Sequence, residues 1–405
     1  MKWSAVKYGT PFFYIFPLYS FRFVHYDYMD SLAGFRTGGG LPANNSEVTT
    51  MKKFCLILTI VMILGLFAGC AGTPVVYYSD CTCPAGSHGS TETEPPVLSK
   101  GELKTGLYIG TSLSDSKSAA AGENGEAKYD VTVVAVTVDE NGVIHSCIID
   151  SVPAGVKFDA AGVITSDLTA EILTKNELGE AYGMKLYGGA KYEWNEQAAA
   201  LAQYAVGKTV EELKNGAIDE TGYASDADLA STATIYLGSY VAAIEAAVNN
   251  AVALGAQSGD TLKLAVIASV GSSKSAEGEN AGTAQLDADV TAITMNGDTI
   301  TSCYIDSLQA KVSFDAAGAI TTDLSAPVLT KNQLGENYGM KLYAGSAYEW
   351  NEQAAAFAAY VTGKTAAEVA GIAVDEKTAP TDADLAATVT IAVGGFQALI
   401  AKAAQ

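Results

Sequence analysis

Two nine-residue segments carry the side chains best suited to do chemistry. They read DADLASTAT, which contains Thr232, and DADLAATVT, which contains Thr388. The pattern predicts that each of these threonines lies in the first turn of a helix, where unpaired backbone amides point outward and favour a phosphate oxygen. Their hydroxyls are therefore candidates for a phosphate ester.

Each segment holds two further candidate side chains. Asp226 and Asp382 open the two segments and have the wrong charge to bind phosphate, so we expect them to cap a turn. Thr234 and Thr390 close the segments. Their hydroxyls could donate to a bound phosphate or bond back to the helix, and the sequence favours neither alternative.

The two segments belong to a long internal duplication. Thr232 and Thr388 are 156 residues apart, and the same spacing relates Lys175 to Lys331, Trp194 to Trp350 and Cys147 to Cys303. We expect repeat 1 at residues 101–254 and repeat 2 at residues 255–405. Each has a size at which a domain can bury its own core.

Both repeats place strands before helices. Alternating apolar and polar residues at 129–138 and 143–149, and again at 290–295 and 299–305, predict antiparallel hairpins. An alanine-rich helix follows from Trp194 and stops at Gly207, and a last helix begins near the motif threonine. The order predicts an α+β fold of two tandem homologous domains, each an antiparallel sheet with packed helices.

The N-terminal hundred residues divide into three segments. Residues 1–50 are aromatic-rich without a clean period, and we interpret them as a non-native extension. Residues 51–70 are basic, then apolar, and end in LFAGC, which resembles a bacterial lipoprotein signal peptide with Cys70 as the lipidated residue. Residues 71–100 are rich in Ser, Thr, Gly and Pro and predict a flexible tether. These features place the protein on the extracellular face of the cell membrane, anchored through Cys70.

Charge and histidine content exclude several function classes. From Ala71 onward the chain has 18 lysines, no arginine and 42 acidic residues. Nucleic acid is therefore not an expected partner, because phosphate backbones require clustered basic residues. Of three histidines only His145 lies in a repeat, so the sequence predicts neither a metal site nor a Ser-His-Asp triad, and no catalytic residues. One cysteine per repeat is typical of a small buried hydrophobe.

The segment at 382–390 resembles the covalent-flavin attachment motif of the FMN-binding domain family, in which the first threonine of Ala-Thr-x-Thr is the acceptor. Thr388 fits this pattern directly, whereas Thr232 follows Ser231 where alanine is usual. The stretches GLYIG at 106–110, YGMK, WNEQ and GKT resemble the two-flavin lipoprotein branch of Gram-positive extracellular electron transfer. Repeat 2 lacks a Gly-x-Tyr-x-Gly and has Leu262–Val266 in its place.

The resemblance implies two covalent FMN groups per chain, attached by a separate flavin transferase whose magnesium Asp226 and Asp382 could help to hold. We expect an aromatic or thioether side chain beside the flavin ring and a cation near its edge. The residues expected there are Met184, Lys185 and Trp194 in repeat 1 and Met340, Lys341 and Trp350 in repeat 2. The alternative for both tryptophans is the core, and we expect Lys175 and Lys331 on a solvated face.

These observations favour an electron-transfer flavoprotein rather than a turnover enzyme. It would relay electrons from a membrane dehydrogenase or quinol donor to extracellular acceptors. The alternative is a non-catalytic surface lipoprotein that binds a ligand or wall polymer, with the threonines as ordinary helix-cap residues. In either case the resemblance allows the released signal peptide to act as a pheromone.

Overall fold

The computed structural model describes residues 101–405. The predicted extension (1–50), the signal peptide with Cys70 (51–70) and the tether (71–100) lie outside the described residues. Among the residues that are described, no helix combines the length and apolarity needed to cross a bilayer.

Two antiparallel sheets form the centre of the described region. The first has the strand order β3-β2-β1-β4 and the second the order β5-β6-β7. The strands are β1 (Glu102–Ser112), β2 (Gly125–Val138), β3 (Ile144–Phe158), β4 (Val252–Gln257), β5 (Thr261–Ser269), β6 (Gly282–Asn296) and β7 (Thr299–Phe314). Both predicted hairpins are confirmed, and their strands are longer than the alternating pattern indicated.

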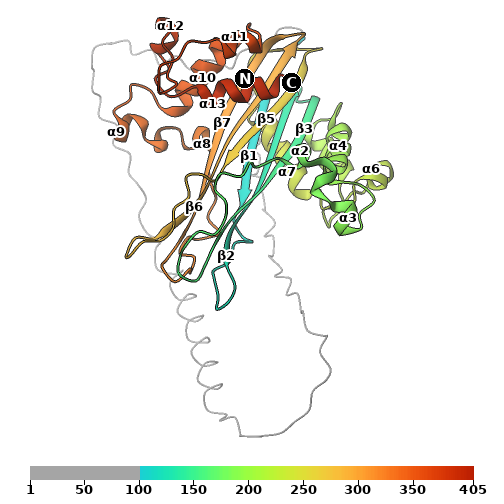
Figure 1. Cartoon of the computed structure of the whole chain (residues 1–405). Coiled ribbons are helices and arrows are strands. Elements are labelled where there is room, and N and C mark those ends of the chain that lie inside the picture. The colour runs from blue at the N-terminus through green and yellow to red at the C-terminus, as the bar shows by residue number, and fades with distance from the viewer. Residues whose placement is uncertain (1–100) are drawn as a thin grey trace, which may run out of the picture. The chain divides into compact units, whose positions relative to one another are not determined.

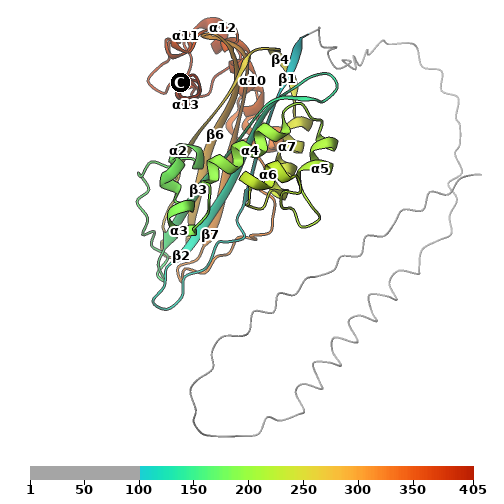
Figure 2. The same ribbon diagram turned by 90° about the vertical axis from the view of Figure 1, so that its right-hand side faces the viewer.

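Helices cover the outer face of each sheet (Figures 1 and 2). Those of repeat 1 are α2 (Lys175–Leu178), η1 (Gly179–Tyr182), α3 (Met184–Gly188), α4 (Trp194–Ala205), α5 (Val210–Ala217), α6 (Ala227–Thr232) and α7 (Gly238–Asn249). Those of repeat 2 are α8 (Lys331–Leu334), η2 (Gly335–Tyr338), α9 (Met340–Ala344), α10 (Trp350–Val361), α11 (Ala366–Ala370), α12 (Ala383–Ala386) and α13 (Gly394–Ala403). The predicted α+β class with two homologous halves is confirmed.

The inner faces of the two sheets pack against each other and make a core that both repeats share. Within this core the rings of Phe158 and Phe314, the last residues of β3 and β7, stack with centroids 4.0 Å apart and planes 2° apart. Each sheet has one further core on its outer face, between the sheet and the helices of the same repeat. Each repeat therefore buries a core of its own only on the helix-covered face of its sheet, and on the other face the two repeats bury one core together.

The strand β4 crosses the expected boundary between the repeats at residues 254 and 255. It pairs antiparallel with β1 and extends the sheet of repeat 1. It also lies close to β7, because a side chain on Gly255 would come within 2.6 Å of the Thr301 carbonyl oxygen. This strand thus joins the two halves by backbone contacts as well as by sequence.

Equivalent residues of the two repeats are 157 positions apart before the β2–β3 turn and 156 positions apart after it. Gly125 pairs with Phe158 in the first sheet, and Gly282 pairs with Phe314 in the second. The turn of repeat 2 is one residue shorter. The counterpart of the GLYIG stretch is consequently Lys263–Ile267, one residue later than the sequence spacing placed it.

Two glycines of the GLYIG stretch make room for specific neighbours. A side chain on Gly106 would lie 2.1 Å from the carbonyl oxygen of Ala247, so glycine allows α7 to approach β1 closely. A side chain on Gly110 would lie 2.1 Å from the hydroxyl of Tyr108. The Tyr108 ring therefore lies over Gly110 on the helix-covered face of the sheet.

Candidate functional site

The motif threonines lie at the C-terminal ends of short helices. Thr232 is the last residue of α6, and Thr388 follows Ala387, the residue that caps α12. The prediction that they open a helix is wrong, because the residues before each threonine fold into a short helix of their own. The unpaired backbone groups at that end are carbonyls, which do not attract phosphate. The long helices α7 and α13 begin later, at Gly238 and Gly394.

Both threonine hydroxyls are accessible and weakly held. The Thr388 side chain is exposed, and its hydroxyl donates only a long bond of 3.4 Å to the Leu385 carbonyl. The Thr232 side chain is half-buried, and its hydroxyl lies 3.4 Å from that of Ser231. Neither motif hydroxyl is therefore committed to a short hydrogen bond within the described residues.

Asp226 and Asp382 cap the short helices, as the sequence predicts. One Asp226 carboxylate oxygen accepts hydrogen bonds from the amides of Asp228 and Leu229, both at 3.0 Å. Asp382 accepts one from the amide of Leu385 at 3.1 Å. Each aspartate thus satisfies backbone donors that would otherwise be unpaired. The possible role of these residues toward a transferase stays a prediction.

The loop after each motif threonine is held by a buried glutamine. In repeat 2 the Gln353 side-chain oxygen accepts bonds from the Thr390 amide (2.8 Å), the Thr390 hydroxyl (3.1 Å) and the Ile391 amide (3.2 Å). Gln197 holds Thr234 and Ile235 in the same way. The hydroxyls of Thr234 and Thr390 therefore bond to a neighbouring helix and not to their own.

A cleft of about 570 Å³ lies beside this loop in repeat 2, between α9, α10 and α13. Two of the predicted ring neighbours, Met340 and Trp350, line it. So do Ile391 and Ala392, which follow Thr388 by three and four residues. The remaining lining side chains that can bind a ligand are Asp289, Lys331, Tyr338 and Tyr343. We call this space the repeat 2 cleft.

The cation in the repeat 2 cleft is Lys331, which the sequence analysis placed on a solvated face. Its ammonium nitrogen lies 4.7 Å from the Trp350 ring centroid and 5.3 Å from that of Tyr338. Lys175 occupies the same place in repeat 1, at 5.0 Å from the Trp194 and Tyr182 rings, and only 9% of it is exposed. The expectation of a solvated face is wrong for Lys175 and holds only in part for the half-buried Lys331, because in both repeats aromatic rings lie against the ammonium group.

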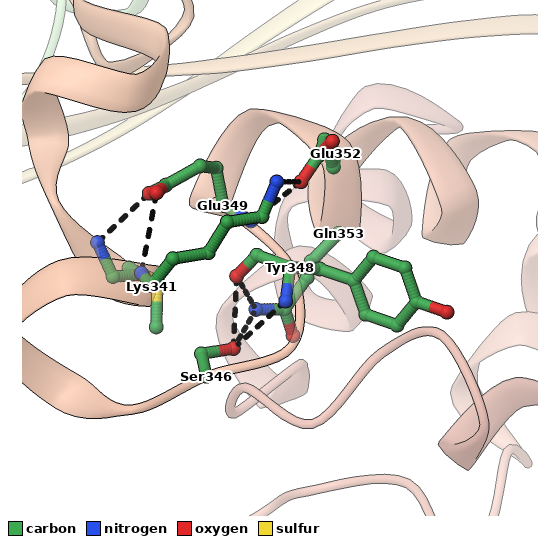
Figure 3. Close-up of polar contacts among 7 residues, drawn as sticks. Lys341, Ser346, Tyr348, Glu349, Glu352 and Gln353 are labelled. Carbon is green, nitrogen blue, oxygen red and sulfur yellow. Dashed lines mark hydrogen bonds and ion pairs between the residues drawn. The ribbon is translucent and has the colours of Figure 1, made fainter.

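Lys185 and Lys341, the predicted ring cations, are engaged elsewhere. The Lys341 ammonium lies 2.8 Å from a Glu352 carboxylate oxygen, and Lys185 pairs with Glu196 at the same distance (Figure 3 shows the repeat 2 pair). The hydrogen bond to Glu352 raises the pKa of Lys341 above its ordinary value. Lys341 does not line the repeat 2 cleft, so this prediction is not supported.

A buried glutamate fixes the wall of the cleft, and sequence reasoning missed it. The Glu349 carboxylate accepts hydrogen bonds from the amides of Met340 (2.8 Å) and Lys341 (3.2 Å), which open α9 (Figure 3). Glu193 does the same for Met184 and Lys185 in repeat 1. The available signal was that glutamate precedes Trp-Asn-Glu-Gln in both repeats.

Both tryptophans are packed in the outer cores, in line with the alternative reading of these residues. Trp194 is 3% exposed and Trp350 is 6% exposed. The Trp194 indole donates a hydrogen bond of 3.1 Å to the Tyr240 hydroxyl. In repeat 2 the corresponding residue is Phe396, and within residues 101–405 the Trp350 indole N–H has no hydrogen-bond partner.

The cysteine of each repeat is a packing residue. Cys147 borders the outer core of repeat 1, and Cys303 lies inside that of repeat 2. Burial raises the pKa of both thiols to about 12. The thiolate that redox chemistry needs is thus strongly disfavoured at neutral pH.

A larger cavity, of about 580 Å³, lies between β4, β7 and α10, and none of the predicted site residues lines it. Comparison with known proteins adds no functional information: no family model, curated protein or solved structure matched the chain.

Proposed function

We propose that the protein is a lipid-anchored electron carrier with one FMN esterified to Thr232 and one to Thr388. A lipid on Cys70 would hold it at the extracellular face of the membrane. A separate flavin transferase would attach the flavins, and electrons would come from a membrane dehydrogenase or quinol and pass to extracellular acceptors. The proposal rests on the motif resemblance, and the observation that carries it furthest is the repeat 2 cleft beside Thr388.

The cleft suits a flavin in size and chemistry. Its volume of about 570 Å³ is within the range of small-molecule sites, roughly 300–1,000 Å³, which are mostly apolar with a few placed polar groups. Tyr343 and Trp350 offer aromatic surface, and the Trp350 N–H is a donor without a partner in the described region. When bound, the flavin supplies the reversible uptake of electrons.

The protein residues would attach, orient and tune the group. Gln353 fixes the loop between Thr388 and Ile391, which sets where the tethered group can reach. Lys331 would place positive charge beside the ring and so favour its reduced, negatively charged form. A covalent link keeps the group at high local concentration where a freely dissociating flavin would be diluted.

The test is coexpression of the chain with a flavin transferase, followed by intact-mass measurement and in-gel fluorescence after denaturation. We expect a mass increase of two FMN groups in the parent. Thr388→Ala and Thr232→Ala should each leave one group, and the double variant none. An unmodified parent would defeat the proposal.

Two control variants make the assignment specific. Thr381→Ala removes an exposed threonine just before the motif aspartate and should leave both modifications intact. Ser231→Ala restores the usual residue before Thr232, and we expect modification of repeat 1 to stay the same or increase. Loss of fluorescence in the Thr381 variant would indicate a folding effect instead of loss of the acceptor.

A further inference from the structure

At one position of the helix-facing sheet surface, a position that lines the repeat 2 cleft, repeat 2 has a charged side chain and repeat 1 a neutral one. Asp289 on β6 pairs with Ser307, and Thr132 on β2 pairs with Ser151. Ser151 and Ser307 are 156 residues apart, as are the other equivalent residues after the turn. Thr132 is therefore the counterpart of Asp289.

Asp289 brings a carboxylate to the repeat 2 cleft, which Lys331 also lines. Within residues 101–405 neither charge has an ion-pair partner. In repeat 1 the buried Lys175 is the counterpart of Lys331, and the neutral Thr132 replaces the carboxylate. The charge that these two positions alone would place beside a bound flavin is thus close to zero in repeat 2, from Asp289 and Lys331, and positive in repeat 1, from Lys175.

The two sites also lie on opposite sides of the shared core. The cleft residues belong to the outer core of the second sheet, and their counterparts belong to that of the first. Both sheets and the shared core, with its Phe158–Phe314 stack, lie between them. Packed sheets are about 10 Å apart, and a helix layer follows on each side. This arrangement favours separate encounters of the two sites with their partners.

Resting on the proposed function, we propose that the repeats are two independent flavin carriers of different midpoint potential, with repeat 2 the lower. A flavin gains negative charge on reduction, so the nearby Asp289 carboxylate opposes its reduction. Lys175, without an opposing carboxylate at position 132, favours reduction in repeat 1. The charge at this one strand position decides the order of the two potentials.

The experiment is a potentiometric titration of singly loaded protein, followed by flavin absorbance. Thr388→Ala leaves repeat 1 loaded, and Thr232→Ala leaves repeat 2 loaded. We expect the midpoint potential of repeat 2 to be the lower one. A tenfold difference in the equilibrium constant for two-electron reduction corresponds to about 30 mV, which is the size of difference expected. In the Thr232→Ala protein, Asp289→Asn should raise the potential of repeat 2, and in the Thr388→Ala protein Thr132→Asp should lower that of repeat 1.

Asp298→Asn is the matched control, because it removes one exposed carboxylate from the β6–β7 turn, outside the cleft. It should leave both potentials unchanged. The titration of the doubly loaded parent should equal the sum of the two single-flavin curves. If the parent curve differs from that sum, the two flavins are not independent carriers. If Asp289→Asn leaves the potential of repeat 2 unchanged, the Asp289 charge does not set it.

Failure of this inference differs from failure of the proposed function. Fluorescence in both singly loaded variants, with equal potentials that Asp289→Asn does not change, would leave the carrier function intact and reject the charge argument. A parent without covalent flavin would reject the proposed function itself.

Discussion

Repeat 1 and repeat 2 share the backbone framework of the candidate site and differ in the side chains that fill it. The helix-capping aspartates, the buried Gln197 and Gln353, and the buried Glu193 and Glu349 accept hydrogen bonds from backbone amides at equivalent places in both halves. The donors are backbone amides, which every residue except proline supplies, so loss of the side-chain acceptor would leave them unpaired. The framework is therefore the part that resists change.

The side chains around the site follow no such constraint. Tyr108, Thr132 and Tyr240 of repeat 1 correspond to Ala265, Asp289 and Phe396 of repeat 2. In repeat 1 the Tyr108 ring lies over Gly110, beside Thr132, and the Tyr240 hydroxyl accepts the Trp194 hydrogen bond. In repeat 2 Asp289 and Phe396 line the cleft, and Ala265 offers no ring in place of Tyr108. The comparison teaches that one framework carries two different chemical environments.

The largest expected effect tests whether the two halves fold as one unit. Phe158→Ala and Phe314→Ala should each lower the free energy of unfolding by about 3–5 kcal/mol, because each leaves a cavity in the shared core. The double variant should lose less than the sum, since both changes remove the same contact. Urea unfolding followed by circular dichroism checks this. Two separate transitions, only one of them affected, would show that the halves are independent.

The glutamine bonds predict the next largest effect. Gln353→Met should lower the free energy of unfolding by about 1–3 kcal/mol, because the amides of Thr390 and Ile391 lose their shared acceptor. Gln197→Met should cost less, since Gln353 also donates to the Ser346 hydroxyl at 3.2 Å, and the repeat 1 counterpart of Ser346 is Ala190. Urea denaturation of both variants gives the order. The reverse order would contradict the framework argument.

Asp306 predicts a pH-dependent difference. Burial raises its pKa to about 6, while the unfolded value is near 3.9. Between about pH 4 and pH 6 the folded protein therefore keeps a proton on Asp306 that the unfolded chain has released. The contribution of Asp306 to the free energy of unfolding is fully present below about pH 4 and is lost as the pH rises through about 6. Asp306→Asn should raise the free energy of unfolding at pH 7 by about 1–3 kcal/mol and change it little at pH 4.

Asp150, its counterpart in repeat 1, is the matched comparison. Burial raises its pKa as well, so Asp150→Asn should give an effect of the same sign. Thermal unfolding at pH 4 and pH 7 measures both variants. Equal destabilisation at the two pH values would mean that the asparagine oxygen cannot replace the carboxylate as acceptor for the Ser307 and Asn332 amides.

The smallest effect is expected when the equivalent aromatic residues Tyr240 and Phe396 are each replaced by the residue found in the other repeat. Tyr240→Phe should lower the free energy of unfolding by about 0.5–1.5 kcal/mol, because the Trp194 indole loses its acceptor. Phe396→Tyr should be neutral or stabilising, since the ring pairs have similar centroid distances of 5.8 Å and 5.9 Å. Equilibrium denaturation compares the two. Destabilisation by Phe396→Tyr would show that the Trp350 N–H is not within reach of a hydroxyl there.

Local patterns in the sequence determined much of this protein. Alternating residues predicted the hairpins because the side chains of a strand alternate between its two faces. Asp226 and Asp382 were recognised as caps because a cap acts on amides two or three residues away. Gly207, which has a φ of +81°, ends α4 at the predicted place for an equally local reason.

The start of the last helix was misplaced because the pattern of apolar residues ran through the motif. The helix begins at Gly238, six residues after Thr232, and the apolar Ile235 precedes it. The motif residues form the separate short helix α6. Between α6 and α7 the amides of Thr234 and Ile235 donate to the Gln197 side chain instead of to helical carbonyls, so the two helices are not continuous. Gln197 lies 37 residues before Thr234, so no local pattern reveals this interruption.

Only the tertiary structure decided which side chains meet at the site. Lys331 and Lys341 are both lysines near the same tryptophan in sequence, yet Lys331 enters the repeat 2 cleft and Lys341 pairs with Glu352 outside it. Asp289 reaches the cleft from a strand more than forty residues before Lys331. The shared core likewise depends on two sheets coming together. Each of these contacts joins residues far apart in the chain, and their proximity follows from packing rather than from any local preference.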